Sequence, residues 1–300
     1  MGSKIILTGS TGKLGSVILN NLLQLVPPSD IIASVYNPSG HQDLKDKGID
    51  VRQGDFNNPE TLVSTFKGGD KLLLISLPSR DDDYRIRAQT AAIDAAKKAG
   101  VKHIYYTSLN FADGSQAKVM KAHFATEDYI KNSGLDYTII REGGYMDSYS
   151  IYLGFWNSSS NKVVVPGDGA VSFADRNELG EATAKLLVTD EFKNKIVTLA
   201  GPRAFTLKET TEILSTILKK DIEFEQVTEQ EFIERNDALR DVAEWWATTY
   251  PSLANGDGAI IDDTLERLLG RTPRRFEEML RSTLKEDPGA SKEMDEWVSH

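Results

Sequence analysis

Short hydrophobic runs alternate with longer stretches of mixed polarity through the first half of the chain. Unbroken apolar runs of this length are typical of strands in a parallel sheet that helices cover on both faces. The clearest such run is Leu72–Ile75. Six segments are predicted to be strands: Lys4–Thr8, Ile31–Tyr36, Asp50–Gln53, Lys71–Ser76, His103–Thr107 and Tyr137–Arg141.

Between these runs, hydrophobic residues recur at helical spacing. The segments Gly12–Leu25, Tyr84–Lys98 and Lys118–Asn132 are predicted to be helices. Pro27-Pro28 stops the first helix, whereas Asp81-Asp82-Asp83 would cap the second. Alternation of strands and helices with short connections predicts an α/β fold with a Rossmann-type, doubly wound parallel sheet.

The pattern changes after Gly143. A short strand is expected over Val163–Val165, with helices over Asn177–Val188 and Leu207–Lys219 and further helices toward the C-terminus. We therefore expect a dinucleotide-binding domain over residues 1–143, with later strands, at about 163–200, returning to its sheet. Residues 144–300 would form a smaller, mostly helical substrate-binding cap.

Composition excludes several classes of function. The chain of 300 residues has no cysteine, so disulfides, cysteine-metal sites and thiol catalysis are excluded. Its net charge of −10 argues against direct binding to nucleic acid or an anionic membrane. Neither an apolar run of about 20 residues nor an export signal is present, and the four dispersed histidines show no metal-ligand spacing. These features predict a cytoplasmic protein without a metal.

A glycine-rich segment, Thr8-Gly9-Ser10-Thr11-Gly12-Lys13-Leu14-Gly15, joins the first strand to the first helix. A diphosphate at this position would meet backbone N–H groups and the positive end of the helix dipole. Gly9 would permit the tight turn, Gly12 would let the backbone approach phosphate, and Gly15 would let the helix pack on the strand. The segment predicts a nucleotide site, although such turns also serve as plain connections.

Further motifs carry a resemblance to a known family. The G-x-x-G-x-x-G spacing is accompanied by Gly54-Asp55-Phe56 and Tyr106-Thr107-Ser108, by the segment from His123 to Glu127, and by Ser133–Arg141. Together they resemble the NmrA-like family of atypical short-chain dehydrogenases/reductases. The chain is closest in pattern to that family's NAD(P)H:quinone oxidoreductases, and the likeness spans nearly the whole sequence.

The resemblance implies a set of cofactor contacts. Asp55 and Phe56 would contact adenine, and Ser108 and His123 would lie on the nicotinamide side. The segment Leu77-Pro78-Ser79, after the fourth strand, would run alongside the nicotinamide ribose and the diphosphate. The full set of expected cofactor-binding residues is Gly9, Ser10, Thr11, Gly12, Lys13, Leu14, Gly15, Tyr36, Asn37, Asp55, Phe56, Ser76, Leu77, Pro78, Thr107 and Ser108.

The choice of cofactor depends on the end of the second strand. The family commonly has Arg-Asn-Pro there, and this chain has Tyr36-Asn37-Pro38. Tyr36 offers neither the arginine that pairs with a 2′-phosphate nor the acid that binds a ribose 2′-OH. Absence of the acid favours NADP(H) over NAD(H), and Ser39, His41 and Lys45 are open alternatives for holding the phosphate.

The catalytic pattern also departs from typical short-chain dehydrogenases. Val119 and His123 stand where a Tyr-x-x-x-Lys pair would lie. His123 either orients a ribose or donates a proton, or is a helix residue bonded to a neighbour. We expect His123, Ser108 and Tyr145 to be catalytic, and Phe111, Tyr145 and Tyr149 to contact substrate. Packing against the sheet is the alternative for the aromatic residues that follow Gly144.

The resemblance predicts an NAD(P)H-dependent oxidoreductase that transfers hydride to a quinone-like or conjugated aromatic molecule. Quinone reduction does not require a dedicated acid, because the phenolate that forms is stabilised. Two alternatives remain: an NmrA-type redox sensor that binds a regulatory protein without turnover, and a non-redox biosynthetic enzyme with His123 as acid or base. A homodimer is a further open alternative.

Overall fold

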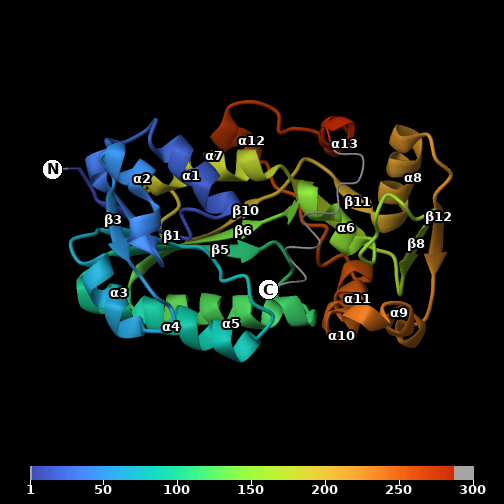
Figure 1. Cartoon of the computed structure of the whole chain (residues 1–300), viewed down its shortest axis with the longest axis horizontal. Coiled ribbons are helices and arrows are strands. Elements are labelled where there is room, and N and C mark those ends of the chain that lie inside the picture. Colours follow the sequence, from blue (N-terminus) through green and yellow to red (C-terminus); the bar gives the residue numbers. More distant parts are fainter. Residues whose placement is uncertain (1, 287–300) are drawn as a thin grey trace. The chain divides into compact units, whose positions relative to one another are not determined.

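The computed structural model describes residues 2–286, and its largest element is a seven-stranded sheet (Figure 1). The strand order is β3-β2-β1-β4-β5-β6-β10, and β1 pairs in parallel with both β2 and β4. This order confirms the doubly wound α/β fold. The strands are β1 (Ile5–Thr8), β2 (Ile31–Val35), β3 (Asp50–Gln53), β4 (Lys71–Leu74), β5 (His103–Leu109), β6 (Asp136–Glu142) and β10 (Lys195–Leu199).

Helices cover both faces of this sheet. In Figure 1, α3, α4 and α5 lie on one face, and α1 and α7 lie on the other. Gly180 of α7 lies against α1, because a Cβ at that position would be 2.5 Å from Cγ1 of Val17. The helices are α1 (Lys13–Leu22), α2 (Gln42–Asp46), α3 (Pro59–Phe66), α4 (Asp82–Ala99), α5 (Lys118–Asn132) and α7 (Arg176–Leu187), with 3-10 turns η1 (Pro28–Asp30) and η2 (Pro38–Gly40).

The chain divides into two compact units, and each is built from three chain segments. Unit 1 comprises Met1–Ser108, Ala122–Arg141 and Leu179–Val197. Unit 2 comprises Leu109–Lys121, Glu142–Glu178 and Thr198–His300. The two units are therefore interleaved along the chain. The sequence prediction was a domain over residues 1–143, with strands at about 163–200 returning to its sheet, and a cap over residues 144–300.

Unit 2 contains two small sheets and most of the later helices. One sheet has the order β11-β9-β7 and the other is the parallel pair β12-β8. Of the strands between residues 163 and 200, β10 joins the main sheet, whereas β8 pairs with β12 and β9 lies between β11 and β7 of unit 2. The elements are β7 (Gly144–Tyr145), η3 (Met146–Ser148), α6 (Tyr149–Tyr152), β8 (Lys162–Val165), β9 (Ala170–Ala174), β11 (Ala204–Thr206), α8 (Leu207–Leu218), β12 (Glu223–Gln226), α9 (Glu229–Arg235), η4 (Asp237–Leu239), α10 (Arg240–Ala247), α11 (Thr249–Ala254), α12 (Thr264–Leu269) and α13 (Phe276–Glu286).

Local sequence explains how α4 begins and ends. The Asp81 carboxylate accepts a hydrogen bond from the Tyr84 N–H at 2.9 Å, which caps the helix as predicted. At the other end Gly100 adopts a left-handed conformation with φ 86°, which is suited to glycine. Within residues 2–286, no helix has the length and apolar character needed to cross a membrane.

Candidate functional site

The glycine turn of unit 1 has the geometry of a phosphate-binding loop. Gly9 has a φ of 61°, and a Cβ on Gly15 would lie 1.9 Å from the Gly9 carbonyl oxygen. Gly12 precedes α1, and a Cβ there would meet only that carbonyl oxygen, at 3.4 Å. Thr11, Gly12 and Lys13 are exposed. The first N–H groups of α1 are therefore accessible to an anion, as this class of site requires.

Ser10 lies in the same turn and is buried. Its hydroxyl has no hydrogen-bond partner among residues 2–286, although buried hydroxyls ordinarily find one. A Cβ on Gly9 would be 3.5 Å from Cβ of Ile75, which places the turn beside the segment that follows β4. These observations fit a ligand with oxygen acceptors at the turn.

The ends of β2 and β3 carry the residues expected near the adenosine. Tyr36 is 71% exposed directly after β2. The Asn37 side-chain oxygen accepts hydrogen bonds from the N–H and hydroxyl of Ser39, at 3.2 and 2.7 Å. Asp55 accepts from the Asn57 N–H at 2.8 Å, and Phe56 packs against the hydrophobic core of unit 1. Tyr36 thus offers a free aromatic ring, and the local turn already uses the Asn37 oxygen.

The segment that follows β4 is attached by hydrogen bonds to β5 and to α4. The Ser76 N–H donates to Oγ1 of Thr107 at 3.0 Å. The Ser76 hydroxyl and the Leu77 N–H both donate to Oε1 of Gln89, at 3.1 and 3.0 Å, and Pro78 is exposed. Ser76, which follows β4, therefore lies beside Thr107 of the adjacent strand β5, and their contacts with a cofactor stay a prediction.

Both ring nitrogens of His123 lie within hydrogen-bond distance of other side chains, and Arg85 and Tyr106 connect the ring to Ser76. The Arg85 guanidinium donates to Nε2 of His123 at 3.1 Å and to Oγ of Ser76 at 2.9 Å. Burial, followed by the charges of Arg85 and Arg141, holds the pKa of His123 well below 6.5. Because arginine is only a donor, Nε2 must accept, so the ring proton of neutral His123 is assigned to Nδ1.

Nδ1 of His123 lies 3.2 Å from Oη of Tyr106 and 3.4 Å from Oγ of Ser108. The assigned proton can therefore be donated to either oxygen. Tyr106 in turn donates its own hydroxyl proton to Oγ of Ser76 at 3.2 Å. His123 thus connects β5 with the segment that follows β4, and it is placed to orient the hydroxyl groups of Tyr106 and Ser108.

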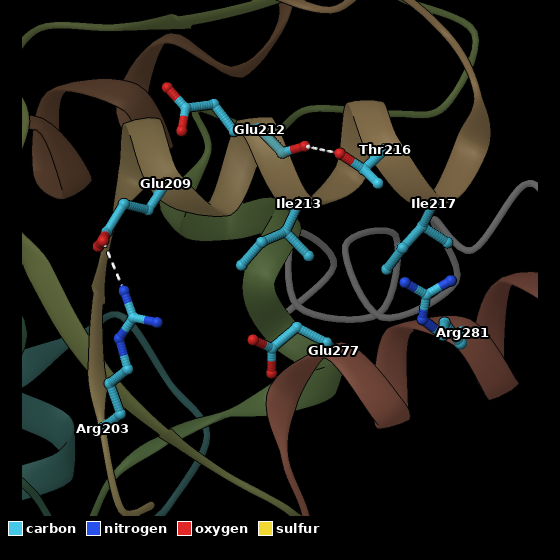
Figure 2. Close-up of a pocket in the computed structure, with 8 residues that line it drawn as sticks. All are labelled: Arg203, Glu209, Glu212, Ile213, Thr216, Ile217, Glu277 and Arg281. Carbon is cyan, nitrogen blue, oxygen red and sulfur yellow. Dashed lines mark hydrogen bonds and ion pairs between the residues drawn. The ribbon is translucent and has the colours of Figure 1, made fainter.

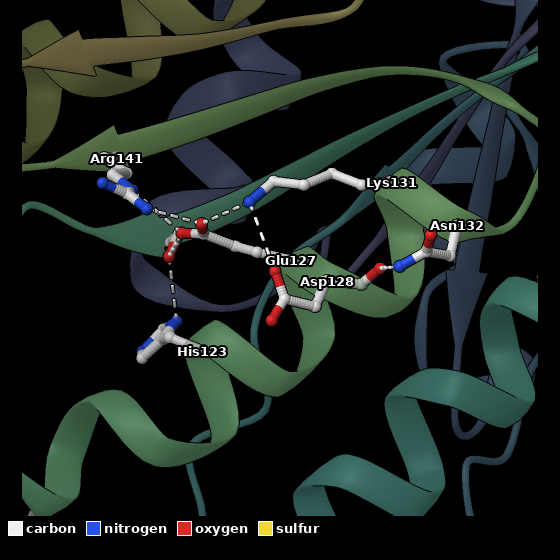
Figure 3. A network of polar contacts seen from close by, with 7 residues as sticks. His123, Glu127, Asp128, Lys131, Asn132 and Arg141 are labelled. Atoms are coloured by element: carbon white, nitrogen blue, oxygen red, sulfur yellow. Dashed lines mark hydrogen bonds and ion pairs between the residues drawn. The ribbon is translucent and has the colours of Figure 1, made fainter. Parts of the chain in front are cut away.

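Ser108 contacts a buried ion pair of unit 1, the pair of Glu127 and Arg141 that Figure 3 shows. Its hydroxyl donates to Oε1 of Glu127 at 2.6 Å. Arg141 donates to both carboxylate oxygens of Glu127, at 3.0 and 2.7 Å, and the two charged side chains are 8% and 1% exposed. A bidentate pair fixes geometry as well as charge. Ser108 is therefore constrained as a donor toward Glu127, and its oxygen remains able to accept a hydrogen bond.

Sequence reasoning gave Arg85, Glu127 and Arg141 no role, although a signal for Glu127 existed. Met120, His123, Glu127 and Ile130 recur at helical spacing, and all four are buried in α5. Two polar residues within an otherwise apolar face predict a buried polar network. The partners of that network on other elements cannot be deduced from periodicity.

Tyr145 belongs to unit 2, where it forms a second polar cluster. Its hydroxyl donates to Oε2 of Glu142 at 2.7 Å. The Arg176 guanidinium lies over the Tyr145 ring, 4.5 Å from the ring centre, and pairs with Asp147 at 3.0 Å. Glu142 was not among the residues that the sequence analysis predicted to be functional.

The other aromatic residues expected to contact substrate are buried within unit 2. Phe111 and Tyr149 are each 2% exposed, and the Tyr149 ring packs edge-on against Phe276 with a centroid separation of 6.2 Å. Phe155 and Trp156 are also buried. The Phe155 ring stacks on Phe232 within unit 2, with a centroid separation of 6.0 Å, so packing explains its burial. Contacts of Phe111 and Tyr149 with substrate stay a prediction.

Two cavities of unit 2 contain none of the predicted site residues. A groove of about 300 Å³ lies between α8 and α13 (Figure 2), and the ion pair of Arg203 and Glu209 lies on its wall. A second cavity of about 180 Å³ borders Phe205 and Phe276. Among residues 2–286, no cluster of acidic and histidine side chains could hold a metal ion.

Comparison with known proteins places this geometry in context. The family model described as "NmrA-like family" matches residues 1–249. An NmrA-like family domain-containing oxidoreductase, flvB, of Aspergillus flavus is 32% identical, over 95% of this chain and 96% of its own length. Quinone oxidoreductase 2 of Escherichia coli is 33% identical, over 89% of this chain and 93% of its own length.

Two solved structures are also similar to this chain. The NADPH complex of the E. coli NADPH-dependent quinone oxidoreductase QOR2 has a TM-score of 0.85 and 31% identity, covering 93% of this chain and 99% of that one. The NADP(H) complex of the Citrobacter sp. triphenylmethane reductase has a TM-score of 0.81 and 32% identity, with the same coverage. Both proteins are similar to this chain along almost its whole length.

Proposed function

This chain belongs to the NmrA-like family, and from that premise we propose that it is an NAD(P)H-dependent reductase. Its substrate would be a quinone-like or conjugated aromatic small molecule that accepts a hydride. The observation that carries the proposal is the glycine turn of unit 1. Its geometry suits a dinucleotide diphosphate, and this chain is similar over nine-tenths of its length to a quinone oxidoreductase solved with NADPH.

The residues of unit 1 fit a dinucleotide in their order along the sheet. Gly9 to Gly15 would hold the diphosphate at the N-terminus of α1, and Asp55 and Phe56 would border the adenine. Ser76, Leu77, Pro78, Thr107 and Ser108 would contact the nicotinamide half, with the last of these fixed by Glu127. A reduced nicotinamide bound there would supply the hydride.

NADP(H) is the proposed cofactor, in preference to NAD(H). No acidic residue follows β2 directly, where one would bind a ribose 2′-OH. The exposed Tyr36 ring is available for stacking on adenine, and it does not oppose a 2′-phosphate. Since no arginine stands at this position, we expect the preference to be modest.

We assign His123 an orienting role in place of proton donation. Its pKa lies well below 6.5, and its Nε2 already accepts from Arg85, so it is a poor acid near neutral pH. Ser108 would position the nicotinamide, and Tyr145, Tyr149 and Phe111 would contact the substrate. A quinone suits this arrangement, because the charge that follows hydride addition is delocalised over its ring.

The test is consumption of NADPH and NADH with a panel of quinones, together with titration of each cofactor by protein fluorescence. We expect turnover with at least one quinone and a lower dissociation constant for NADPH than for NADH. Absence of turnover with every quinone would contradict the reductase, and equal dissociation constants would contradict the cofactor preference.

A redox sensor is the second candidate, and one observation favours it. The pair that typically supplies a proton in short-chain dehydrogenases is replaced by Val119 and a fully engaged His123. A protein that binds a dinucleotide and changes its grip on a regulatory partner needs no such pair. Tight cofactor binding without turnover would support the sensor over the reductase.

A further inference from the structure

We propose that Glu142 and Tyr145 of unit 2 form a proton relay for the reduction, in which Tyr145 touches the substrate oxygen and Glu142 resupplies its proton. This inference rests on the proposed reductase function and deepens it. Hydride transfer to a quinone leaves one further proton to be delivered, and the relay gives that proton a source within the protein.

The geometry of the pair is that of two groups that share a proton. Oη of Tyr145 and Oε2 of Glu142 are 2.7 Å apart, which is the distance of a direct hydrogen bond between two oxygen atoms. With Glu142 ionised, the Tyr145 hydroxyl must donate to it. With Glu142 protonated, the carboxyl group can donate across the same contact, and the Tyr145 proton becomes available to a substrate oxygen.

Burial favours the protonated carboxyl group. Glu142 is 2% exposed, and its other oxygen, Oε1, has no hydrogen-bond partner within residues 2–286. A buried carboxylate with an unsatisfied oxygen is costly, whereas its neutral form is much less so. Burial therefore raises the pKa of Glu142 to about 7, against the opposing effects of the Tyr145 hydrogen bond and the charge of Arg176.

The charged groups around the pair are consistent with this role. Arg176 stacks on the Tyr145 ring, and its charge is matched by Asp147. The positive charge of Arg176 lowers the pKa of both Glu142 and Tyr145, against the larger effect of burial. Burial and Glu142 hold the pKa of Tyr145 well above 10, so its hydroxyl stays protonated until an acceptor takes the proton.

The step balances in atoms and electrons. The reduced nicotinamide loses a hydride and is oxidised, and the quinone gains the hydride and its two electrons. The electron pair that moves to a quinone oxygen forms a bond to the Tyr145 proton as the phenolic O–H bond breaks. Tyr145 recovers a proton from the Glu142 carboxyl group, which is reprotonated by solvent.

The first experiment compares quinone turnover between about pH 5.5 and pH 9 in the parent and in the Glu142→Gln and Tyr145→Phe variants. Glutamine keeps an acceptor for the Tyr145 hydroxyl but does not titrate. We expect the kcat of the parent to fall above pH 7, as Glu142 ionises. Both variants should lose about 100-fold in kcat near pH 6 and should lack this pH dependence.

Two controls separate proton delivery from disturbed structure. Tyr152→Phe removes another buried phenol of unit 2 and should keep the parent's pH profile. A cationic triphenylmethane dye becomes neutral on accepting a hydride and needs no proton. Glu142→Gln should therefore lower the kcat for the dye much less than the kcat for the quinone. If the quinone kcat falls about 100-fold, the dye kcat should fall by about 10-fold at most.

A measurement on the cofactor-free protein gives a readout that is independent of activity. The infrared difference between the parent and Glu142→Gln should contain a protonated-carboxyl band that disappears with a midpoint near pH 7. If this band were already absent above about pH 6, the relay would be overturned. The relay would also be overturned if the parent were active and the Glu142→Gln variant kept full quinone turnover. A parent inactive on quinones and dyes alike would overturn the proposed function, and the relay with it.

Discussion

At the scale of single residues, His123 and Glu142 show burial acting with opposite effects on two titrating groups. Burial disfavours charge in each case, so it lowers the pKa of the imidazole and raises that of the carboxyl group. The consequences for stability have opposite signs. Each group has one pKa in the folded chain and another in the unfolded chain. Between these two values, the unfolded chain binds more protons than the folded one at His123 and fewer at Glu142.

His123 therefore makes the fold sensitive to acid. Its folded pKa is well below 6.5, so the unfolding free energy should decrease as pH falls below 6.5. Replacing His123 with glutamine should make this decrease shallower, although the variant loses some stability at every pH. Urea denaturation of both proteins at about pH 5 and about pH 8 measures the effect.

His103, whose pKa is lowered to about 4, is common to both proteins and serves as an internal reference. Its contribution to the acid sensitivity cancels when the two pH dependences are subtracted. An identical pH dependence in the parent and in His123→Gln would contradict the assignment of a neutral, buried His123.

At the scale of elements, the sequence predicts those features whose causes are local. The strands that form β1, β2 and β4 follow from unbroken apolar runs, and α4 follows from its capping aspartate and final glycine. The pairing of β8 with β12 joins segments far apart in the chain, and neither strand's own pattern specifies its partner. Most residues of the candidate cofactor segments lie at the ends of strands, where sequence motifs could identify them.

The buried network was less predictable, because its partners come from different elements. Arg85 lies on α4, His123 and Glu127 lie on α5, and Arg141 lies on β6. Helical periodicity shows that a side chain points inward, but tertiary packing determines which polar group it meets. The same reasoning applies to Glu142, whose partners are Tyr145 and the charge of Arg176.

The turn between β1 and α1 offers a matched pair of substitutions. A methyl group on Gly15 would lie 1.9 Å from a backbone oxygen, whereas one on Gly12 would lie 3.4 Å from the same atom. Gly15→Ala should destabilise the fold by about 1–3 kcal/mol, because backbone must move. Gly12→Ala should leave the melting temperature within a few degrees and weaken NADPH binding at least tenfold, or by about 1.4 kcal/mol.

Calorimetric titration and thermal unfolding of both variants separate these effects. If Gly12→Ala bound NADPH as tightly as the parent, the turn would not hold the diphosphate. If Gly15→Ala were as stable as the parent, the close approach of α1 to the turn would have no structural importance.

At the scale of the whole molecule, the proposed cofactor contacts all belong to unit 1, although they come from five strand ends. Binding should therefore order several segments that are distant in sequence. We expect NADPH to slow amide hydrogen exchange in residues 9–15, 34–37, 54–56 and 76–78, with little change in α8 and α13 of unit 2. Protection confined to α8 and α13 would contradict the assignment of the cofactor to unit 1.

The interleaving of the two units has a consequence for how the chain can be produced or divided. Leu179–Val197 completes unit 1 and carries most of β10, which lies beside β6 in the seven-stranded sheet. A fragment that stopped at residue 143 would lack this strand and leave β6, with its apolar Ile139 and Ile140, as an open edge prone to aggregation. During synthesis, the same edge stays uncovered until the ribosome has made β10, so chaperone demand should peak before residue 199 emerges.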